Sequence, residues 1–218
     1  MSDGVTMIDS VVEMVRARSG LTTTAIIDGD NELSYGNLDT RSNQVAQFLL
    51  GLGTRAGDRV GFLGRNCAEF FEVLFGAAKI GAVVCAVNWR LSPEEVRYIL
   101  EDSGARTVIV HNEFCGLAPP TLGLVILDGP QGTFASARDE APTDDPGHRP
   151  ETSDTWLQLY SSGTTGHPKG VLITYGNLAA FLAAGVGTNQ FFADSVSMVA
   201  LPIFHIGGTG WAMQALAN

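Results

Sequence analysis

The stretch RVGFLGRNCAEFFEVLFGAAKIGAVVCAV, residues 59–87, places a long apolar run between two short ones. The short runs, residues 59–63 and 82–87, are typical of buried strands, and the second of them is rich in valine. Residues 69–80 are long enough for a helix that is apolar on most sides. The order strand, helix, strand predicts two parallel strands joined by a right-handed crossover.

The flanking segments continue this alternation. Ser34 is an N-cap candidate for a helix that precedes the first strand. After the second strand, Ser92 and Glu95 enclose a proline in a capping-box pattern, which predicts another helix. Residues 107–110 and 124–127 have the composition of two further strands. The predicted fold class is α/β, with mainly parallel sheet layers flanked by helices.

Composition divides the chain into three parts. Residues 1–130 carry the strand and helix alternation and are predicted to form a first α/β subdomain. Residues 131–153 lie in a stretch rich in Pro, Gly, Asp and Thr without apolar periodicity, which predicts a surface connection. Residues 154–218 are predicted to begin a second α/β subdomain.

Charge and cysteine content narrow the class of protein. The 218 residues are 45% hydrophobic and 17% charged, which is typical of a globular chain. A net charge of -10 argues against nucleic-acid binding, which depends on clustered Lys and Arg. Cys67, Cys85 and Cys115 are odd in number and widely spaced, so neither a disulfide framework nor a metal site is expected. We expect a cytoplasmic protein without a signal peptide and with peripheral membrane contact at most.

The stretch YSSGTTGHPKGV, residues 160–171, is the part of the sequence that indicates chemistry. Its glycines allow close approach of the backbone, and its hydroxyl and amide groups can donate to phosphate oxygens. Lys169 adds a positive charge and is one of only two lysines in the chain. The pattern is not a Walker A loop, because Gly170 follows the lysine and a strand-like run follows the glycine. A flexible polar turn is the simpler alternative, but the whole run favours phosphate binding.

This stretch resembles the phosphate-binding signature of the adenylate-forming enzymes, a superfamily that includes acyl-CoA synthetases, adenylation domains and beetle luciferases. Ser161 stands where threonine is commoner, and the hydroxyl is kept. The resemblance to fatty-acyl-CoA ligases extends over about residues 20–218. The supporting segments are LSYGNL (33–38), GDRV (57–60), GAAKIGAV (76–83) and VNWRL (87–91). By this resemblance the chain would be part of the large N-terminal domain of such an enzyme.

The resemblance implies roles for individual residues of the signature. The residues expected to hold the β- and γ-phosphates of ATP are Ser161, Ser162, Gly163, Thr164, Thr165, Gly166 and Lys169. Lys169 and Thr164 would be catalytic, because they would stabilise the charge that develops on the departing pyrophosphate. Magnesium would share that task, and coenzyme A would accept the acyl group.

A second stretch, LPIFHIGG at residues 201–208, places a histidine before two glycines. From the residues alone, His205 either caps a helix or faces a cavity. The resemblance implies the second, with His205 beside the substrate carboxylate and with Gly207 and Gly208 leaving room for the acyl group. No chemistry is assigned to the other histidines, to the cysteines or to Trp89 and Arg90.

The leading interpretation is therefore an AMP-forming ligase that converts a carboxylic acid to its acyl-CoA thioester. Among carboxylic acids, the resemblance favours a fatty acid as the substrate. An aryl-CoA ligase and a carrier-protein-loading acyl-AMP ligase are alternatives, and so is a non-catalytic folded fragment that associates with itself or another chain. The later family motifs for adenine, ribose and the catalytic lysine of the C-terminal domain are not in this sequence. The 218 residues alone are thus expected to have no ligase activity.

Overall fold

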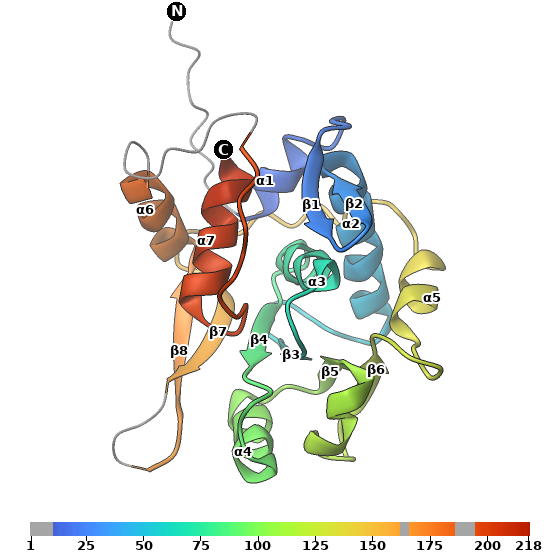
Figure 1. Ribbon diagram of the computed structural model, residues 1–218, viewed down its shortest axis with the longest axis vertical. Helices are drawn as coiled ribbons and strands as arrows, with labels where there is room; N and C mark the ends of the chain where they lie inside the picture. The colour runs from blue at the N-terminus through green and yellow to red at the C-terminus, as the bar shows by residue number, and fades with distance from the viewer. Residues whose placement is uncertain (1–10, 162–165, 186–194) are drawn as a thin grey trace, which may run out of the picture.

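The computed structural model describes residues 11–161, 166–185 and 195–218 (Figure 1). Within these residues, the first half contains α1 (Val11–Arg16), β1 (Thr24–Asp28), β2 (Asn31–Ser34), α2 (Tyr35–Gly51), β3 (Arg59–Leu63), α3 (Ala68–Ala78), β4 (Val83–Val87), α4 (Pro93–Ser103) and β5 (Thr107–Val110). The remainder contains the 3-10 helix η1 (Asn112–Leu117), β6 (Gly123–Ile126), α5 (Phe134–Asp139), β7 (Thr155–Ser161), β8 (Lys169–Thr174), α6 (Tyr175–Gly185) and α7 (Ile206–Ala217). The elements expected from the sequence in residues 34–127 are present.

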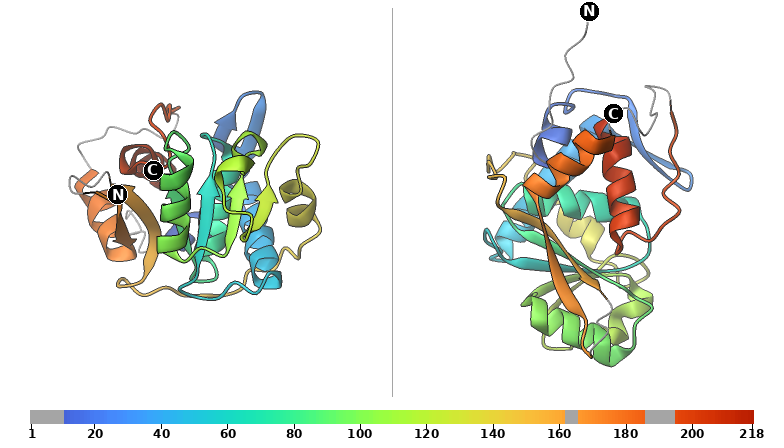
Figure 2. Two further views of the ribbon diagram at one scale, coloured as in Figure 1. Left: turned by 90° about the horizontal axis from the view of Figure 1, so that it is seen from below. Right: turned by 90° about the vertical axis from the view of Figure 1, so that its left-hand side faces the viewer.

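Six of the described strands form one sheet in the order β6, β5, β3, β4, β7, β8. All neighbours in this sheet are parallel except β7 and β8, which are antiparallel. β1 and β2 form a separate hairpin. Figure 2 shows the twist of the sheet and the helices that cover it. The predicted α/β class with a mainly parallel sheet is confirmed.

Local sequence explains where the helices begin. The Ser34 side chain accepts a hydrogen bond from the backbone N–H of Asn37 and caps α2. Ser92 and Glu95 form the expected capping box at the start of α4, with Pro93 at its first position. These side chains satisfy backbone N–H groups that have no partner inside the helix.

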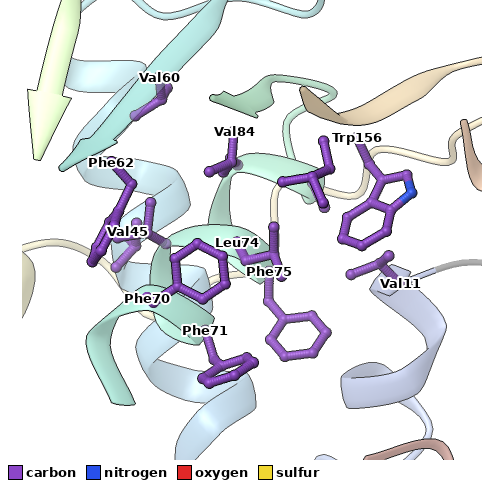
Figure 3. Packing of buried hydrophobic residues seen from close by; sticks show 14 of the residues in the cluster. Val11, Val45, Val60, Phe62, Phe70, Phe71, Leu74, Phe75, Val84 and Trp156 are labelled. Atoms are coloured by element: carbon purple, nitrogen blue, oxygen red, sulfur yellow. The ribbon is translucent and has the colours of Figure 1, made fainter. Parts of the chain in front are cut away.

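The alternation of side chains along the central strands creates two cores. Val84 and Ala86 of β4 belong to a large cluster with α2 and α3, whereas Cys85 and Val87 belong to a smaller cluster with α4 and η1. Successive side chains of a strand point to opposite faces, so both faces of the sheet are covered. In the large cluster the ring of Phe70 packs edge-on against two other phenylalanine rings, with centroids 5.0 and 5.3 Å away (Figure 3).

Two buried charge clusters join the helices of the large core. Glu72 of α3 is fully buried and forms ion pairs with Arg41 of α2 and Arg138 of α5. Lys79, just after α3, is also fully buried, and its Nζ atom donates to Asp39 Oδ1 and to Asn43 Oδ1, each at 2.6 Å. A buried charge is tolerated when it is paired in this way, so these contacts fix α2, α3 and α5 relative to one another.

The segment expected to be a surface connection contains a short helix of its own. In α5, Phe134 is fully buried and Arg138 reaches Glu72. A single buried aromatic residue in a Gly- and Pro-rich stretch produces no apolar periodicity, which is why the sequence did not reveal this helix. The segment therefore connects two parts of the chain and also packs against α2.

The strands of residues 154–218 extend the sheet of residues 1–130. β7 pairs directly with the central strand β4, with Leu157 opposite Val84. The boundary at residues 131–153 is therefore not a boundary between sheets. The division into two subdomains stays a prediction. Among the residues that the structure describes, no helix is long and apolar enough to cross a membrane.

Candidate functional site

The signature stretch lies where β7 turns into β8. Ser161 ends β7 and is paired in register with Lys169, the first residue of β8. Both residues are exposed, as is Gly166, which has a φ of +129°. Four predicted phosphate ligands, Ser162, Gly163, Thr164 and Thr165, lie outside the described residues. The structure thus brings the hydroxyl-bearing and cationic ends of the signature to one edge of the sheet.

Side chains of β7 attach the turn end of this hairpin to the neighbouring helix α4. The Tyr160 hydroxyl donates to Asp102 of α4 at 2.6 Å and accepts from the Gln158 amide at 3.0 Å. Burial, followed by the hydrogen bond to Asp102, raises the pKa of Tyr160, so the phenol keeps its proton at neutral pH. A Cβ atom on Gly170 would lie 2.7 Å from the Gln158 amide nitrogen, so a larger residue there would displace the Gln158 side chain.

His167 adds a second link between the hairpin and α4. Its ring stacks on Tyr98 with a centroid distance of 4.6 Å and an interplanar angle of 21°. The sequence assigned His167 no chemistry, and the contact is one of packing. Together with the bond between Tyr160 and Asp102, the stack attaches the hairpin to α4 at two points, one in β7 and one just before β8.

A cavity of about 450 Å³ lies beside the hairpin, within the size range of small-molecule sites. Its apolar lining residues are Ala86, Leu91, Ile99, Leu159, Pro168, Val171, Ile173, Phe204 and Ile206. Its polar lining residues are Asn88, Glu95, Tyr160, Ser161 and His205. The cavity therefore brings together Ser161 of the signature and His205 of the second predicted stretch.

His205 has the two features between which the sequence could not decide. It is the N-cap of α7, where its Nδ1 atom accepts from the backbone N–H of Gly207 at 3.0 Å. It also lines the cavity. Because Nδ1 accepts a hydrogen bond, a neutral ring carries its proton on Nε2, which is then a donor. A role beside a substrate carboxylate stays a prediction.

Gly207 and Gly208 are not among the residues that line the cavity. Gly208 is buried, and a Cβ atom there would lie 2.2 Å from the backbone oxygen of Pro202. A Cβ atom on Gly207 would lie 3.0 Å from a methyl group of Leu201. Gly208 thus allows close packing of α7 against the chain that leads into this helix. The predicted contact of the two glycines with an acyl group stays a prediction.

The wall formed by Asn88, Leu91, Glu95 and Ile99 was not predicted as part of a site. Asn88 follows β4 directly, and the other three residues lie on the connection to α4 or in α4 itself. Ligands of parallel α/β sheets bind at the carboxyl ends of the strands. That rule, applied to the predicted strand at residues 82–87, could have identified Asn88.

The cysteines are unsuited to nucleophilic chemistry. Cys85 is fully buried, and Cys67 and Cys115 are partly buried. Burial raises the pKa of all three thiols, that of Cys85 to about 12. A thiol is nucleophilic as the thiolate, so these three stay largely unreactive at neutral pH.

The family model described as AMP-binding enzyme matches residues 13–218. The chain belongs to this family. It is 36% identical over 204 residues to the fatty acid--[acyl-carrier-protein] ligase ScoC of Streptomyces coeruleorubidus, with 88% of this chain and 38% of that protein covered. It is 34% identical over 195 residues to a feruloyl-CoA synthase of an Amycolatopsis species, with 89% of this chain and 39% of that protein covered.

A solved structure has the same architecture. The N-terminal domain of FACL13 from Mycobacterium tuberculosis superposes with a TM-score of 0.83 at 26% identity, over 95% of this chain and 54% of that one. The predicted correspondence to the N-terminal domain of an adenylate-forming enzyme is thereby confirmed. The chain spans less than two fifths of the length of the two curated relatives named above.

The described donors at the end of the hairpin suit a phosphate group. The Ser161 hydroxyl and the Lys169 ammonium lie on paired positions, and both are donors that phosphate oxygens accept. The described residues contain no group of three or more His, Cys, Asp or Glu side chains that could hold a metal ion. None of these residues is therefore assigned to magnesium.

Proposed function

We propose that this chain supplies the phosphate-binding hairpin and part of the acyl cavity of an ATP-dependent ligase that activates a fatty acid. The observation that carries the proposal is the position of Ser161. It ends β7 opposite Lys169, and it also lines the cavity that His205 reaches. A phosphate held by the hairpin and a carboxylic acid held in the cavity would therefore meet at this residue.

The reaction has two steps that need no nucleophilic side chain. A carboxylate oxygen attacks the α-phosphorus of ATP, and the bond to pyrophosphate breaks to give an acyl-adenylate. The sulfur of coenzyme A then attacks the acyl carbon, and AMP leaves. In the first step Lys169 would neutralise charge on the departing pyrophosphate, and magnesium bound to the phosphates would supply further positive charge. Thr164 is proposed to share this task through its hydroxyl.

The lining of the cavity supports an aliphatic acid as substrate. Leu91, Ile99, Leu159, Val171 and Ile173 present branched aliphatic side chains, and such walls favour an apolar tail because its transfer from water is favourable. The relative named as a fatty acid ligase is consistent with this choice. Because another relative is named as a feruloyl-CoA synthase, an aryl acid is the second candidate substrate. Because the fatty acid ligase is named for an acyl-carrier protein, a carrier protein is an alternative acceptor to coenzyme A.

The role of the hairpin can be tested by calorimetric titration of the 218-residue chain with magnesium-ATP. Lys169→Ala should weaken binding by at least about tenfold, the loss expected for one hydrogen bond to a charged group. Arg97→Ala is the matched control, because Arg97 is an exposed cation on the neighbouring helix α4. Equal affinities of wild type and Lys169→Ala would count against a phosphate role for Lys169.

The substrate class is tested on the same chain with dodecanoate and ferulate. Tighter binding of dodecanoate supports a fatty acid as the substrate. Tighter binding of ferulate indicates an aryl acid as the substrate instead. If the folded chain binds neither acid nor magnesium-ATP, the interpretation as a non-catalytic folded unit gains support. Acyl-CoA formation by the 218 residues alone would refute the expectation that the chain is inactive by itself.

A further inference from the structure

Asn66 links the start of α3 to the chain that leads into the cavity wall. It lies between β3 and α3, at the carboxyl end of β3. Its Nδ2 atom donates to the backbone oxygens of Val199 at 3.3 Å and Leu201 at 3.0 Å. Its Oδ1 atom accepts from the backbone N–H of Ile203 at 3.1 Å. One amide thus holds three points of a five-residue segment.

The chain that leads into the segment held by Asn66 has no regular secondary structure. Residues 195–200 belong to no helix or strand. The side chains of Val196 and Met198 are 83% and 82% exposed, so they contribute little apolar burial. The Asn66 contacts therefore lie where this irregular chain enters the large core at Ile203.

Ile203 is fixed on both sides of its peptide. Asn66 binds its N–H, and the buried hydroxyl of Thr209 in α7 donates to its carbonyl oxygen at 2.5 Å. The Ile203 side chain is 1% exposed and lies in the large core. Phe204 and His205 follow directly and line the cavity. The cavity wall consequently begins at a residue that cannot shift without losing contacts with both the β3–α3 connection and α7.

We propose that Asn66 is a positioning residue that sets the placement of Phe204 and His205 and thereby the affinity of the cavity for a carboxylic acid. The inference rests on the proposed function for the identity of the ligand. Only a side chain with both a donor and an acceptor can make this set of contacts. An aspartate at position 66 would keep the acceptor for the Ile203 N–H. Its second oxygen would replace the donor and face the carbonyl oxygens of Val199 and Leu201.

The first measurement is amide hydrogen exchange of the 218-residue chain, resolved by residue with NMR. In Asn66→Ala the Ile203 amide should exchange about tenfold faster, while the amides of β3 keep their rates, since one hydrogen bond is lost locally. Asn31→Ala is the matched control, because Asn31 is exposed on the separate β1–β2 hairpin. An unchanged Ile203 rate in folded Asn66→Ala would overturn the proposal.

The second measurement is the affinity for dodecanoate and for magnesium-ATP. Asn66→Ala should raise the Kd for dodecanoate about five- to tenfold and leave the Kd for magnesium-ATP within about twofold. Asn66→Asp should retain much of the Ile203 protection and still lose dodecanoate affinity. Equal losses for both ligands, with faster exchange throughout β3, would indicate a merely structural role and would also overturn the proposal.

The two measurements separate this inference from the proposed function. If wild type does not bind dodecanoate but Ile203 protection depends on Asn66, the acyl role of the cavity is wrong and the positioning of the segment stands. If wild type binds dodecanoate and Asn66→Ala binds it equally well, the proposed function survives and the positioning role is refuted.

Discussion

Replacing Glu72 with glutamine should destabilise the folded chain by about 3–5 kcal/mol, the usual cost of leaving a buried charge without its partner. Glu72 is fully buried in α3. Its Oε2 atom accepts from Arg138 Nη1 at 2.7 Å, and its Oε1 atom accepts from Arg41 Nη1 at 3.0 Å. Glutamine keeps the volume but removes the charge, and its NH₂ group would face one of the two donors.

The two arginines contribute unequally to this loss. The Arg138 side chain is 8% exposed and can recover little hydration, whereas Arg41 is 42% exposed and can turn toward water. Arg138 Nε also donates to Asp139, whose side chain is 63% exposed. Since that second partner relieves part of the penalty, a value near the lower end, about 3 kcal/mol, is expected.

Urea unfolding followed by circular dichroism at pH 7 measures this free energy. Glu72→Gln should lower the midpoint without changing the slope, because the surface exposed on unfolding stays the same. Glu101→Gln, a matched change on the exposed side of α4, should alter stability by less than about 0.5 kcal/mol. The double variant Glu72→Leu/Arg138→Met should be more stable than Glu72→Gln, because it removes both buried charges. A loss below about 1 kcal/mol in Glu72→Gln would refute the reasoning.

Three further substitutions test other contacts. Hydrogen bonding from Arg16 lowers the pKa of Asp145 to about 2, so Asp145→Asn should cost about 1–2 kcal/mol at pH 7, after allowance for its partial exposure. This stabilisation is present above the ordinary carboxyl pKa near 4 and is lost as the pH falls through 2, so the two unfolding curves should converge there. Gly208→Ala should cost about 2–3 kcal/mol in thermal unfolding because its Cβ atom would meet the Pro202 oxygen. Ser92→Ala should cost about 1 kcal/mol by the same measurement, through loss of the cap of α4.

The sequence predicted those parts of the fold that depend on neighbouring residues. The caps at Ser34 and Ser92 and the strand at residues 59–63 follow from patterns of a few residues, and the structure confirms each of them. The strand-like run predicted after Gly170 is present as part of β8 for the same reason. Such features need no knowledge of where the rest of the chain lies.

The remaining features depend on contacts between distant segments. The burial of Phe134 and the ion pair of Arg138 with Glu72 exist because α5 packs beside α2. The contact of Asn66 with Ile203 joins residues 137 positions apart. Neither the period of the apolar residues nor the local composition contains this information, so these two long-range contacts could not be derived from the sequence.

The order of strands explains why these distant residues form one site. β3, β4 and β7 are adjacent and parallel, so the residues that follow them, including Asn66 and Asn88, lie at the same edge of the sheet as Ser161 at the end of β7. β8 runs in the opposite direction, and its first residue, Lys169, therefore starts at that edge as well. A parallel β8 would begin at the other end of the sheet and would carry the lysine away from Ser161. The antiparallel direction of β8 thus places the exposed Lys169 beside the cavity. A change that shifts the pairing of β7 and β8 should impair phosphate binding even if every signature residue is kept.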